Sequence, residues 1–250
     1  MRQLFYLNHS GFVLELERAV LVFDYFTDPA SVLSRYEESA KSFFFFVSHA
    51  HYDHWNSDIF HFSPPGRRFF FLEEGCELPD FSFQEAREDE RIYKVKPGFC
   101  EENEAMAEAG LRRVRAMGST DEGVSFLIDT EDGIVFHSGD LNFWDWEAPG
   151  EVDKAMEAAY RTELERVAEA AGGKKLWLTM LPVDQRLGEK AFAGAMVFFE
   201  YFKTDYFVPD HLNGGFDLPG KLAGKVPEGA AEVLPMITPG QHYRLKKGSA

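Results

Sequence analysis

Short apolar runs separated by polar turns dominate the first part of the chain. Residues 3–7, 12–16 and 20–23 follow one another closely, and this spacing predicts a meander of three antiparallel strands. The next run, FFFFV at residues 43–47, contains no polar position, so we expect a strand that is buried on both faces. A helix start signal at Asp28-Pro29 predicts a short helix over residues 30–40.

The middle of the chain is predicted to consist mainly of strands. Alternating or apolar stretches indicate strands at residues 67–72, 91–95, 111–117, 124–128 and 134–136. The last two are expected to form a hairpin, because EDG at residues 131–133 is a tight-turn signal. Residues 58–62 are predicted to form a short helix, and the acidic, alanine-rich residues 101–110 a hairpin tip or loose turn.

The last hundred residues alternate between helices and strands. Apolar side chains recur at three- and four-residue steps from Val152 to Val167, which predicts a long helix over residues 151–171. A second helix is expected at residues 191–202, and strands are expected at residues 176–181 and 206–208. Residues 214–227 are expected to be a surface loop, and residues 237–245 to add one edge strand. Because no repeat or linker is visible, we expect a single domain over residues 1–250.

Four side chains of the metal-ligating type lie within six positions, directly after the run at residues 43–47. They are His49, His51, Asp53 and His54. Neutral imidazole and carboxylate suit zinc and related divalent ions. Residues two apart in an extended segment point to the same side, so His49 and His51 can converge on one ion. A turn into a helix at His54 would direct Asp53 and His54 toward a second ion.

Two other positions share this setting at the end of an apolar strand. Asp140 follows the strand at residues 134–136, and its two carboxylate oxygens could bridge two ions. The small residues Ser138 and Gly139 would let the backbone approach an ion closely. His211 follows the strand at residues 206–208. A turn aspartate and a surface histidine are simpler interpretations of each position alone, but together with the first loop they favour a metal site.

Composition narrows the class of protein and of partner. Hydrophobic residues make up 45% of the 250 residues, which excludes a disordered chain. The formal charge of −16 opposes binding to nucleic acid. No apolar run reaches the length of a membrane span, and the first residues contain no long apolar signal segment. We therefore expect a cytoplasmic protein with a small-molecule substrate and no nucleic-acid or membrane partner, and we leave open its association into a homo-oligomer.

Three segments together resemble the metal motifs of the metallo-β-lactamase fold superfamily. They are SHAHYDH at residues 48–54, SGD at residues 138–140 and VPDH at residues 208–211, and their order and separation are also similar. More narrowly, the chain is similar to bacterial hydrolases near the UlaG-like ascorbate-phosphate lactonases. The resemblance covers nearly the whole chain. It implies an α+β fold, a four-layer αββα sandwich with a binuclear metal site at one edge.

The resemblance also implies a role for each ligand-type residue. His49 and His51 would bind the first ion. Asp53, His54 and His211 would bind the second, and Asp140 would bridge the two. A metal-bound hydroxide would be the nucleophile, and Asp53 would act in catalysis by orienting it. The implied activity is hydrolysis of an ester, lactone, amide or phosphoester, with zinc as the expected cofactor and manganese or iron as alternatives.

One position departs from the superfamily pattern. A further histidine normally precedes the strand at residues 124–128, but residues 116–123 read AMGSTDEG. The first ion would then keep three protein ligands and water, which is enough for a catalytic zinc but lowers its affinity. Asp121 or Glu122 could replace the histidine and favour harder ions such as manganese or iron. A polar turn is the simpler interpretation of this segment.

Four more residues are candidates for contacts with the ligands or the substrate: His9, Ser119, Asp121 and Arg186. Arg186 could bind a substrate anion, although pairing with Asp184 explains it equally well. Trp144 and Trp146 could line a pocket or simply pack. The absent histidine motivates an alternative function, a non-catalytic or degenerate metal-binding protein of the same fold with one intact ion site.

Overall fold

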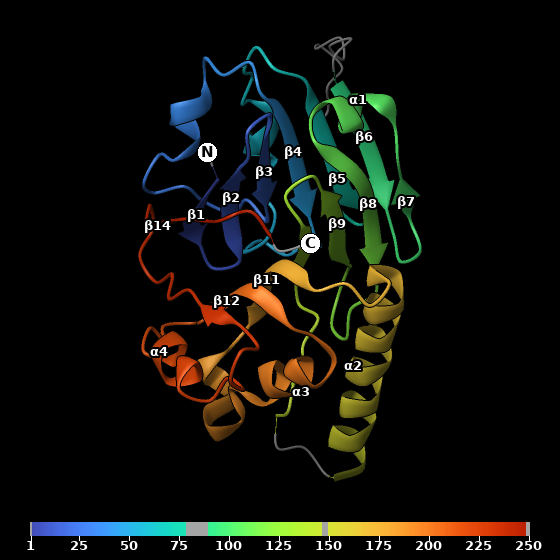
Figure 1. Cartoon of the computed structure of the whole chain (residues 1–250), viewed down its shortest axis with the longest axis vertical. Helices are drawn as coiled ribbons and strands as arrows, with labels where there is room; N and C mark the ends of the chain where they lie inside the picture. Colours follow the sequence, from blue (N-terminus) through green and yellow to red (C-terminus); the bar gives the residue numbers. More distant parts are fainter. Residues whose placement is uncertain (1, 79–89, 147–149, 249–250) are drawn as a thin grey trace.

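Two β-sheets packed face to face form the body of the protein (Figure 1). The computed structural model describes residues 2–78, 90–146 and 150–248, and within these ranges each sheet has seven strands. The first sheet contains β1 (Gln3–Asn8), β2 (Gly11–Glu15), β3 (Ala19–Phe23), β4 (Ser42–Val47), β5 (Arg68–Glu73), β6 (Glu90–Val95) and β14 (His242–Arg244). The second contains β7 (Cys100–Glu101), β8 (Leu111–Met117), β9 (Ser125–Thr130), β10 (Ile134–His137), β11 (Leu176–Pro182), β12 (Thr204–Asp210) and β13 (Glu232–Val233).

The first sheet combines the predicted meander with a parallel half. Its order is β14-β1-β2-β3-β4-β5-β6; pairing is antiparallel from β14 to β3 and parallel from β3 to β6. The phenylalanine run forms β4, which lies between β3 and β5 and is buried on both faces, as predicted. The rings of Phe44, Phe45 and Phe46 stack on the residues opposite them in β5, at centroid distances of 4.6, 4.8 and 5.2 Å. These stacked rings bury both faces of the two strands and hold the loop after β4 on a rigid support.

The second sheet repeats this division. Its order is β13-β12-β11-β10-β9-β8-β7, with antiparallel pairing from β7 to β10 and parallel pairing from β10 to β13. The hairpin of β9 and β10 is confirmed. The α-helices of the described ranges are α1 (Glu104–Glu108), α2 (Gly150–Ala171), α3 (Ala193–Tyr201) and α4 (Leu218–Ala223). The 3-10 helices are η1 (Leu33–Tyr36), η2 (Ser57–Phe60) and η3 (Gln185–Lys190).

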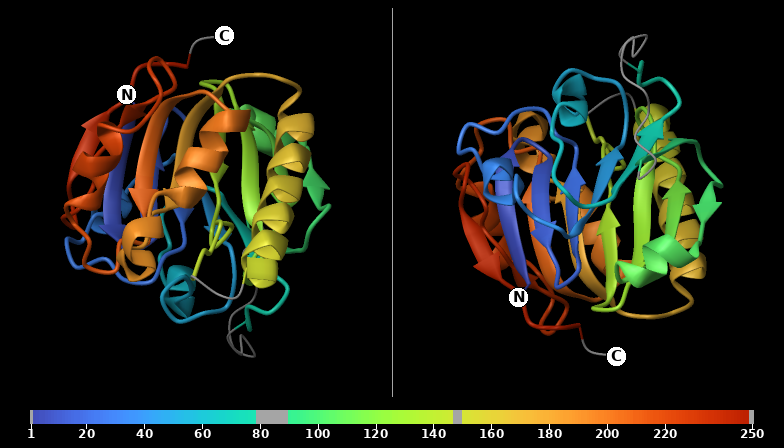
Figure 2. Two further views of the ribbon diagram at one scale, coloured as in Figure 1. Left: turned by 90° about the horizontal axis from the view of Figure 1, so that it is seen from below. Right: turned by 90° about the horizontal axis from the view of Figure 1, so that it is seen from above.

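Apolar side chains fill three layers between four layers of backbone. Between the sheets, Phe46 packs edge-on against Phe126 at a centroid distance of 5.2 Å. Helices α2 and α3 cover the outer face of the second sheet (Figure 2). Their side chains Leu164 and Phe198 are buried there. The outer face of the first sheet is covered by η1, η2 and their loops. The fold is therefore the expected α+β sandwich, and one of its outer layers consists of short 3-10 helices. Over the described ranges, no helix combines the length and apolar character that crossing a membrane requires.

Three local predictions are wrong. The helix predicted at residues 30–40 is reduced to η1, because Ser31 has a φ of 51° and interrupts a helical path at the outset. Residues 101–110 contain α1, which is capped where the Asn103 side chain accepts a hydrogen bond from the Met106 N–H at 2.9 Å. Residues 214–227 contain α4, whose Leu218 and Leu222 are buried under the second sheet. The helices α1 and α4 are too short to produce a clear apolar period.

Candidate metal centre

The candidate ligands, and an aspartate behind one of them, follow the carboxyl ends of strands from both sheets. Asp24 follows β3, and the loop that begins at Ser48 follows β4. Asp140 follows β10, and His211 follows β12. The two sets of strand ends meet, since Asp24 Oδ2 of the first sheet lies 2.8 Å from Nε2 of His137 of the second. Residues separated by more than a hundred positions are thereby brought to one edge of the sandwich.

The loop after β4 makes one helical turn. The N–H groups of His54 and Trp55 both donate to the carbonyl of His51, at 3.0 and 2.9 Å. After this turn, His49 and His51 belong to one group of ligand-type side chains, and Asp53 and His54 belong to another. The placement matches the separation inferred from the spacing, whereas the role of each residue as a ligand stays a prediction.

Three residues of this edge have a left-handed backbone. The φ angles of His9, Asp24 and His211 are 53°, 39° and 53°. For residues other than glycine this conformation costs on the order of 1–3 kcal/mol, and such strain is found mainly where the surrounding structure enforces it. At each of these positions the chain turns sharply after a strand, so that the side chain stays at the sheet edge.

Two glycines allow other segments to approach the same loop. Gly139 has a φ of 52°, and a Cβ there would lie 2.6 Å from the Cβ of Ser48. Gly123 has a φ of 76°, and its Cβ would lie 2.1 Å from the Ser48 carbonyl oxygen. The N–H of Val124 donates to that oxygen at 2.9 Å. The loop is thus packed between the segment before β9 and the segment after β10.

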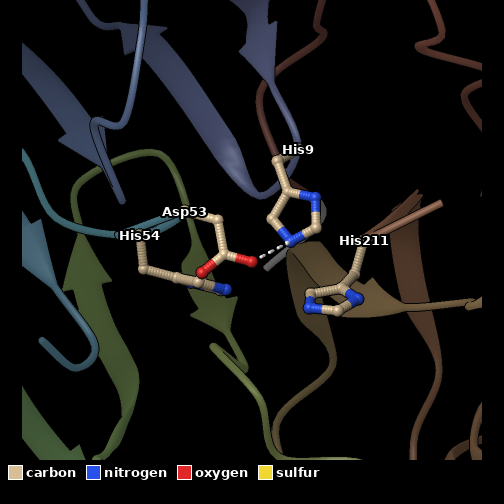
Figure 3. Close-up of side chains that lie close together, drawn as sticks. All are labelled: His9, Asp53, His54 and His211. Carbon is tan, nitrogen blue, oxygen red and sulfur yellow. Dashed lines mark ion pairs between the residues drawn. The ribbon is translucent and has the colours of Figure 1, made fainter. Parts of the chain in front are cut away.

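His9, Asp53, His54 and His211 form the larger group of ligand-type side chains (Figure 3). One ligand atom of each lies within 4.8 Å of the others. His9 Nε2 is 3.3 Å from Asp53 Oδ2. The sequence indicated only that His9 could lie near the ligands, and the structure places it among them. Three imidazoles and one carboxylate are a donor set that zinc binds.

Asp140 lies between this group and a smaller one, formed by His49, His51 and Asp140 itself. Its Oδ2 is 3.5 Å from His49 Nε2. Its Oδ1 is 3.3 Å from His54 Nε2 and 3.6 Å from His211 Nε2. One oxygen therefore faces each group, which is the arrangement that a carboxylate bridging two cations needs.

Several buried polar atoms at this junction have no hydrogen-bond partner within the described ranges. They are His9 Nε2, His54 Nε2 and Asp140 Oδ1. Buried polar atoms are almost always hydrogen-bonded, so unpaired ones that gather at one point require an explanation. A cation provides it, because imidazole lone pairs and carboxylate oxygens are both its ligands. The residues therefore fit a metal centre.

A buried carboxylate orients His54 from behind. Asp24 Oδ2 lies 2.8 Å from Nδ1 of His54 and accepts a hydrogen bond from the Ser48 hydroxyl at 2.7 Å. Its Oδ1 accepts the backbone N–H of Ser48, also at 2.7 Å. Burial opposes ionisation of Asp24, but the charges of His137 and His54 outweigh it and hold its pKa well below the usual range. The ionised carboxylate therefore fixes the proton of His54 on Nδ1 and leaves Nε2 for a cation.

Asp184 plays the same part for His211. Its Oδ2 lies 2.9 Å from Nδ1 of His211 and accepts a hydrogen bond from the Asn213 amide at 2.8 Å. Burial opposes its ionisation, but hydrogen bonds from His211 and Arg186 outweigh burial and lower its pKa. Neither Asp24 nor Asp184 belonged to the set of site residues predicted from the sequence. Each follows an apolar strand directly or by one residue, and this was the signal that could have identified them.

His49 and His54 differ in their pKa values. Burial lowers the pKa of His49 to about 4, and the neighbouring His54 acts in the same direction. Burial also opposes protonation of His54, but the carboxylates of Asp24 and Asp140 outweigh it and raise its pKa to about 9. At neutral pH a cation that binds His54 Nε2 must therefore displace a proton, whereas His49 is already neutral.

The turn that lacks the expected histidine lies against the smaller group. Glu122 Oε2 is 3.2 Å from His51 Nε2, and both side chains are largely open to solvent. Burial raises the pKa of Asp121, and the charge of Asp140 raises it further. Ser119 accepts a hydrogen bond from the Asp121 N–H at 3.3 Å through its hydroxyl and so shapes the turn. The turn at residues 116–123 thus carries the carboxylates of Asp121 and Glu122 where the superfamily pattern has a histidine.

No protein-family model matches the sequence, and no curated protein is similar to it at a significant level. Solved structures do match. Igni18, a metallo hydrolase from Ignicoccus hospitalis, aligns with a TM-score of 0.64 and 16% identity over 98% of this chain and 99% of its own. The metallo-β-lactamase fold protein YhfI from Bacillus subtilis aligns with a TM-score of 0.56 and 12% identity over 98% and 100%. The chain therefore has the metallo-β-lactamase fold.

A third match differs in its chemistry. CmlA, a diiron β-hydroxylase from Streptomyces venezuelae, aligns with a TM-score of 0.59 and 13% identity over 98% of this chain. This chain spans about half of CmlA, 54% of its length. At such identities the similarity concerns the fold alone, and the fold occurs with more than one metal and more than one reaction. The narrower similarity to UlaG-like lactonases stays a prediction.

Proposed function

We propose that this protein is a metal-dependent hydrolase that acts on a small-molecule ester, lactone or phosphoester. The observation that carries the proposal is the position of Asp140. Its two oxygens face two separate groups of ligand-type side chains, and unpaired buried atoms of His9 and His54 point to the same place. A structural ion pair would satisfy these atoms with hydrogen bonds, whereas a pair of cations would bind them directly.

The proposed ligands divide into two sets. His9, Asp53, His54 and His211 would hold one ion; His49, His51 and Asp140 would hold the other, with Asp140 bridging them. A divalent ion bound there acts as a Lewis acid and lowers the pKa of a water molecule toward neutrality. The predominance of imidazole favours zinc, and the carboxylates near His51 leave manganese and iron as alternatives.

Asp53 and His9 are suited to orient the attacking water. The adjacent imidazole of His9 lowers the pKa of Asp53, and the charge of His54 acts in the same direction, so this carboxylate is ionised at neutral pH and can accept a hydrogen bond from water. Burial lowers the pKa of His9, so its imidazole is neutral at the same pH. Asp53 is the residue that we propose to be catalytic, and His9 Nε2 lies 3.3 Å from its carboxylate, so that both side chains can face the same ion.

One observation favours a second candidate, a non-catalytic metal-binding protein with a single intact site. The smaller group has only three members, and the side chain of His51 is 47% exposed. The larger group has four members, none of which is exposed, and its His54 is fully buried. If the smaller group held no ion, the protein would bind one ion tightly at the larger group and would turn over no substrate.

Elemental analysis of protein purified without added metal separates the two candidates. The hydrolase predicts about two equivalents of zinc, manganese or iron and turnover across a panel of esters, lactones and phosphoesters. One tightly bound equivalent with no turnover, even after zinc is added in excess, would instead identify the metal-binding protein. Retention of full turnover after complete chelation would exclude the metal-dependent mechanism.

A further inference from the structure

Arg186 lies next to the metal centre because it shares a carboxylate oxygen with a proposed ligand. Its Nε and Nη2 donate to Asp184 Oδ2 at 2.8 and 2.5 Å. His211 Nδ1 contacts the same oxygen at 2.9 Å. The guanidinium and the imidazole are therefore neighbours around one atom. The Arg186 side chain is nevertheless 51% exposed, so its remaining edge is open to a ligand.

Arg186 carries a positive charge in a protein that is otherwise strongly acidic. The hydrogen bond to Asp184 raises the pKa of Arg186, and the carboxylates of Asp140 and Asp53 raise it further. The guanidinium therefore lies within the field of the metal centre and stays cationic. Because the chain carries a formal charge of −16, most of its surface repels anions, and a fixed cation beside the centre offers a local exception.

Two indole rings extend the site outward from His211. The ring of Trp144 meets His211 edge-on at 5.5 Å, and its Nε1–H donates to the Asp140 carbonyl at 2.9 Å. Trp146 stacks on Trp144 with an angle of 4° between the rings and a centroid distance of 5.8 Å. The guanidinium carbon of Arg186 lies 5.5 Å from the centre of the Trp146 ring. A continuous column thus runs from the metal centre to a half-exposed tryptophan.

A small hollow of about 180 Å³ opens at the end of this column. It is lined by Trp146 and Arg186, together with Asp145, Leu187 and Gly188. Asp145 does not leave an uncompensated negative charge there, because its Oδ2 is 3.0 Å from Lys190 Nζ. The volume is below that of sites which enclose a whole ligand, so the hollow suits one substituent of a molecule whose remainder lies elsewhere.

We propose that Arg186 and Trp146 form a substrate subsite that binds a carboxylate or phosphate group attached to a planar apolar moiety. The guanidinium would pair with the oxyanion, and the indole face would contact the planar part. The adjoining metal centre would then meet an ester or lactone bond of the same molecule. This assignment rests on the proposed function and narrows its substrate to anionic esters and lactones.

Pairing with Asp184 alone does not account for the arrangement. Asp184 also receives the backbone N–H of Arg186 at 2.8 Å and the amide of Asn213 at 2.8 Å, so it is well satisfied without two guanidinium bonds. Nor does pairing explain why Trp146 is 50% exposed beside the cation. A large apolar ring and a partly open guanidinium that meet at a hollow are the elements of a binding site.

The test is calorimetric titration of the zinc-loaded protein with benzoate, phenyl phosphate and the neutral isostere benzamide. We expect the two anions to bind at least tenfold more tightly than benzamide. Arg186→Gln should reduce this preference to less than twofold without changing the zinc content. Arg186→Lys should retain part of it, and Trp146→Leu should weaken all three ligands by a similar factor, about fivefold or more.

A matched control removes a guanidinium at the amino end of β5, which is the end of the first sheet opposite the metal centre. Arg67 pairs there with Glu108 at 2.8 Å, and Arg67→Gln should change benzoate affinity by less than twofold. An equal loss in Arg67→Gln and Arg186→Gln would show a general field effect and overturn the subsite. Benzoate affinity that is unchanged in Arg186→Gln but lost on removal of zinc would also overturn it, because the anion would then be bound by the metal alone.

A kinetic measurement separates this inference from the proposed function. For a phenyl ester with a free carboxylate, Arg186→Gln should raise KM at least tenfold with little change in kcat, whereas the neutral methyl ester of the same compound should be affected less than twofold. Equal effects on both esters would reject the subsite and leave the hydrolase intact. Absence of turnover of any ester by the unaltered protein would reject the hydrolase, while the titrations would still decide whether the subsite exists.

Discussion

The Nδ1 atom of His54 lies 2.8 Å from Oδ2 of Asp24, and both side chains are fully buried. This pair connects two strands of the first sheet to the second sheet, because Asp24 also lies 2.8 Å from Nε2 of His137. The same contact directs Nε2 of His54 toward Asp140 at 3.3 Å. The Asp24 carboxylate therefore both joins the two sheets and orients the proposed ligand His54.

Asp24→Asn is expected to weaken zinc binding about 10- to 100-fold, which is the usual effect of removing a carboxylate behind a ligand histidine. The amide keeps the shape of the side chain but loses the charge that holds His54 in its tautomer. The measurement is competition with a chromophoric chelator at pH 7. Asp58→Asn is the matched control, because Asp58 pairs at 3.5 Å with His61 on the exposed surface. Equal affinity in the two variants would contradict the proposed role of Asp24.

His54→Ala and His211→Ala are expected to lose the ion of the larger group and at least about 100-fold in turnover, because each removes an imidazole that faces Asp140. Zinc content and ester hydrolysis are measured on the same preparations. His61→Ala serves as the control, since the His61 side chain is 80% exposed and belongs to neither group. Full metal content in both site variants would rule out the proposed ligand set.

His9→Ala is expected to lower the affinity of the larger group by about tenfold while two equivalents still bind at saturating zinc, because three ligands of that group remain. Glu122→Gln should affect only the weaker of two binding steps, since Glu122 contacts His51 of the smaller group at 3.2 Å. Calorimetric titration of zinc into chelator-treated protein resolves the two steps. A pattern in which both variants alter the same step would show that the groups do not act as separate sites.

Gly123→Ala is expected to destabilise the protein by more than about 2 kcal/mol, because it combines backbone strain with a clash. Its Cβ would lie 2.1 Å from the Ser48 carbonyl oxygen, and its φ is 76°. Gly98→Ala has a comparable φ of 94° but meets no atom within 4 Å among the described residues, so it isolates the strain. Urea unfolding of both variants measures the difference. Similar losses would show that the close approach to the loop contributes little.

The two cysteines are expected to differ in reactivity and in their effect on alkaline stability. Burial raises the pKa of Cys76 to about 12 from its ordinary value of 9.0, whereas Cys100 is exposed. At pH 8 one thiol per folded chain should react with a disulfide reagent, and two after unfolding. Because the thiol of Cys76 keeps its proton in the folded chain, its contribution to stability is complete below pH 9 and is lost as the pH rises toward 12.

The stability part of this prediction is checked by urea unfolding at intervals from pH 8 to pH 11. The free energy of unfolding should fall more steeply with pH in the unaltered protein than in Cys76→Ala, by up to about 1.4 kcal/mol per pH unit. Cys100→Ala should keep the steeper slope. Parallel slopes in all three proteins would show that the Cys76 thiol ionises equally well in the folded chain.

Much of the architecture follows from local patterns in the sequence. The phenylalanine run was expected to be a strand covered on both faces, because a stretch without polar positions is stable only when neither face meets water. The long helix was evident from its apolar period. The helices α1 and α4 escaped prediction, since five or six residues cannot display such a period and their formation depends on a cap or on burial under neighbouring elements.

The sequence by itself identified six ligand-type residues from His49 to His211 and the strand ends that carry them, because side-chain chemistry and strand periodicity are local properties of the chain. Only the tertiary structure decided that His9 joins the larger group and that Asp24 and Asp184 stand behind His54 and His211. These contacts join residues that are 27 or more positions apart in the sequence. Most of these residues lie in turns that follow different strands. Asp24 meets His54, and Asp184 meets His211, because the strands before them pair as neighbours within one sheet, whereas His9 meets His211 only because the two sheets pack with these edges together. No local pattern in the sequence encodes either kind of meeting.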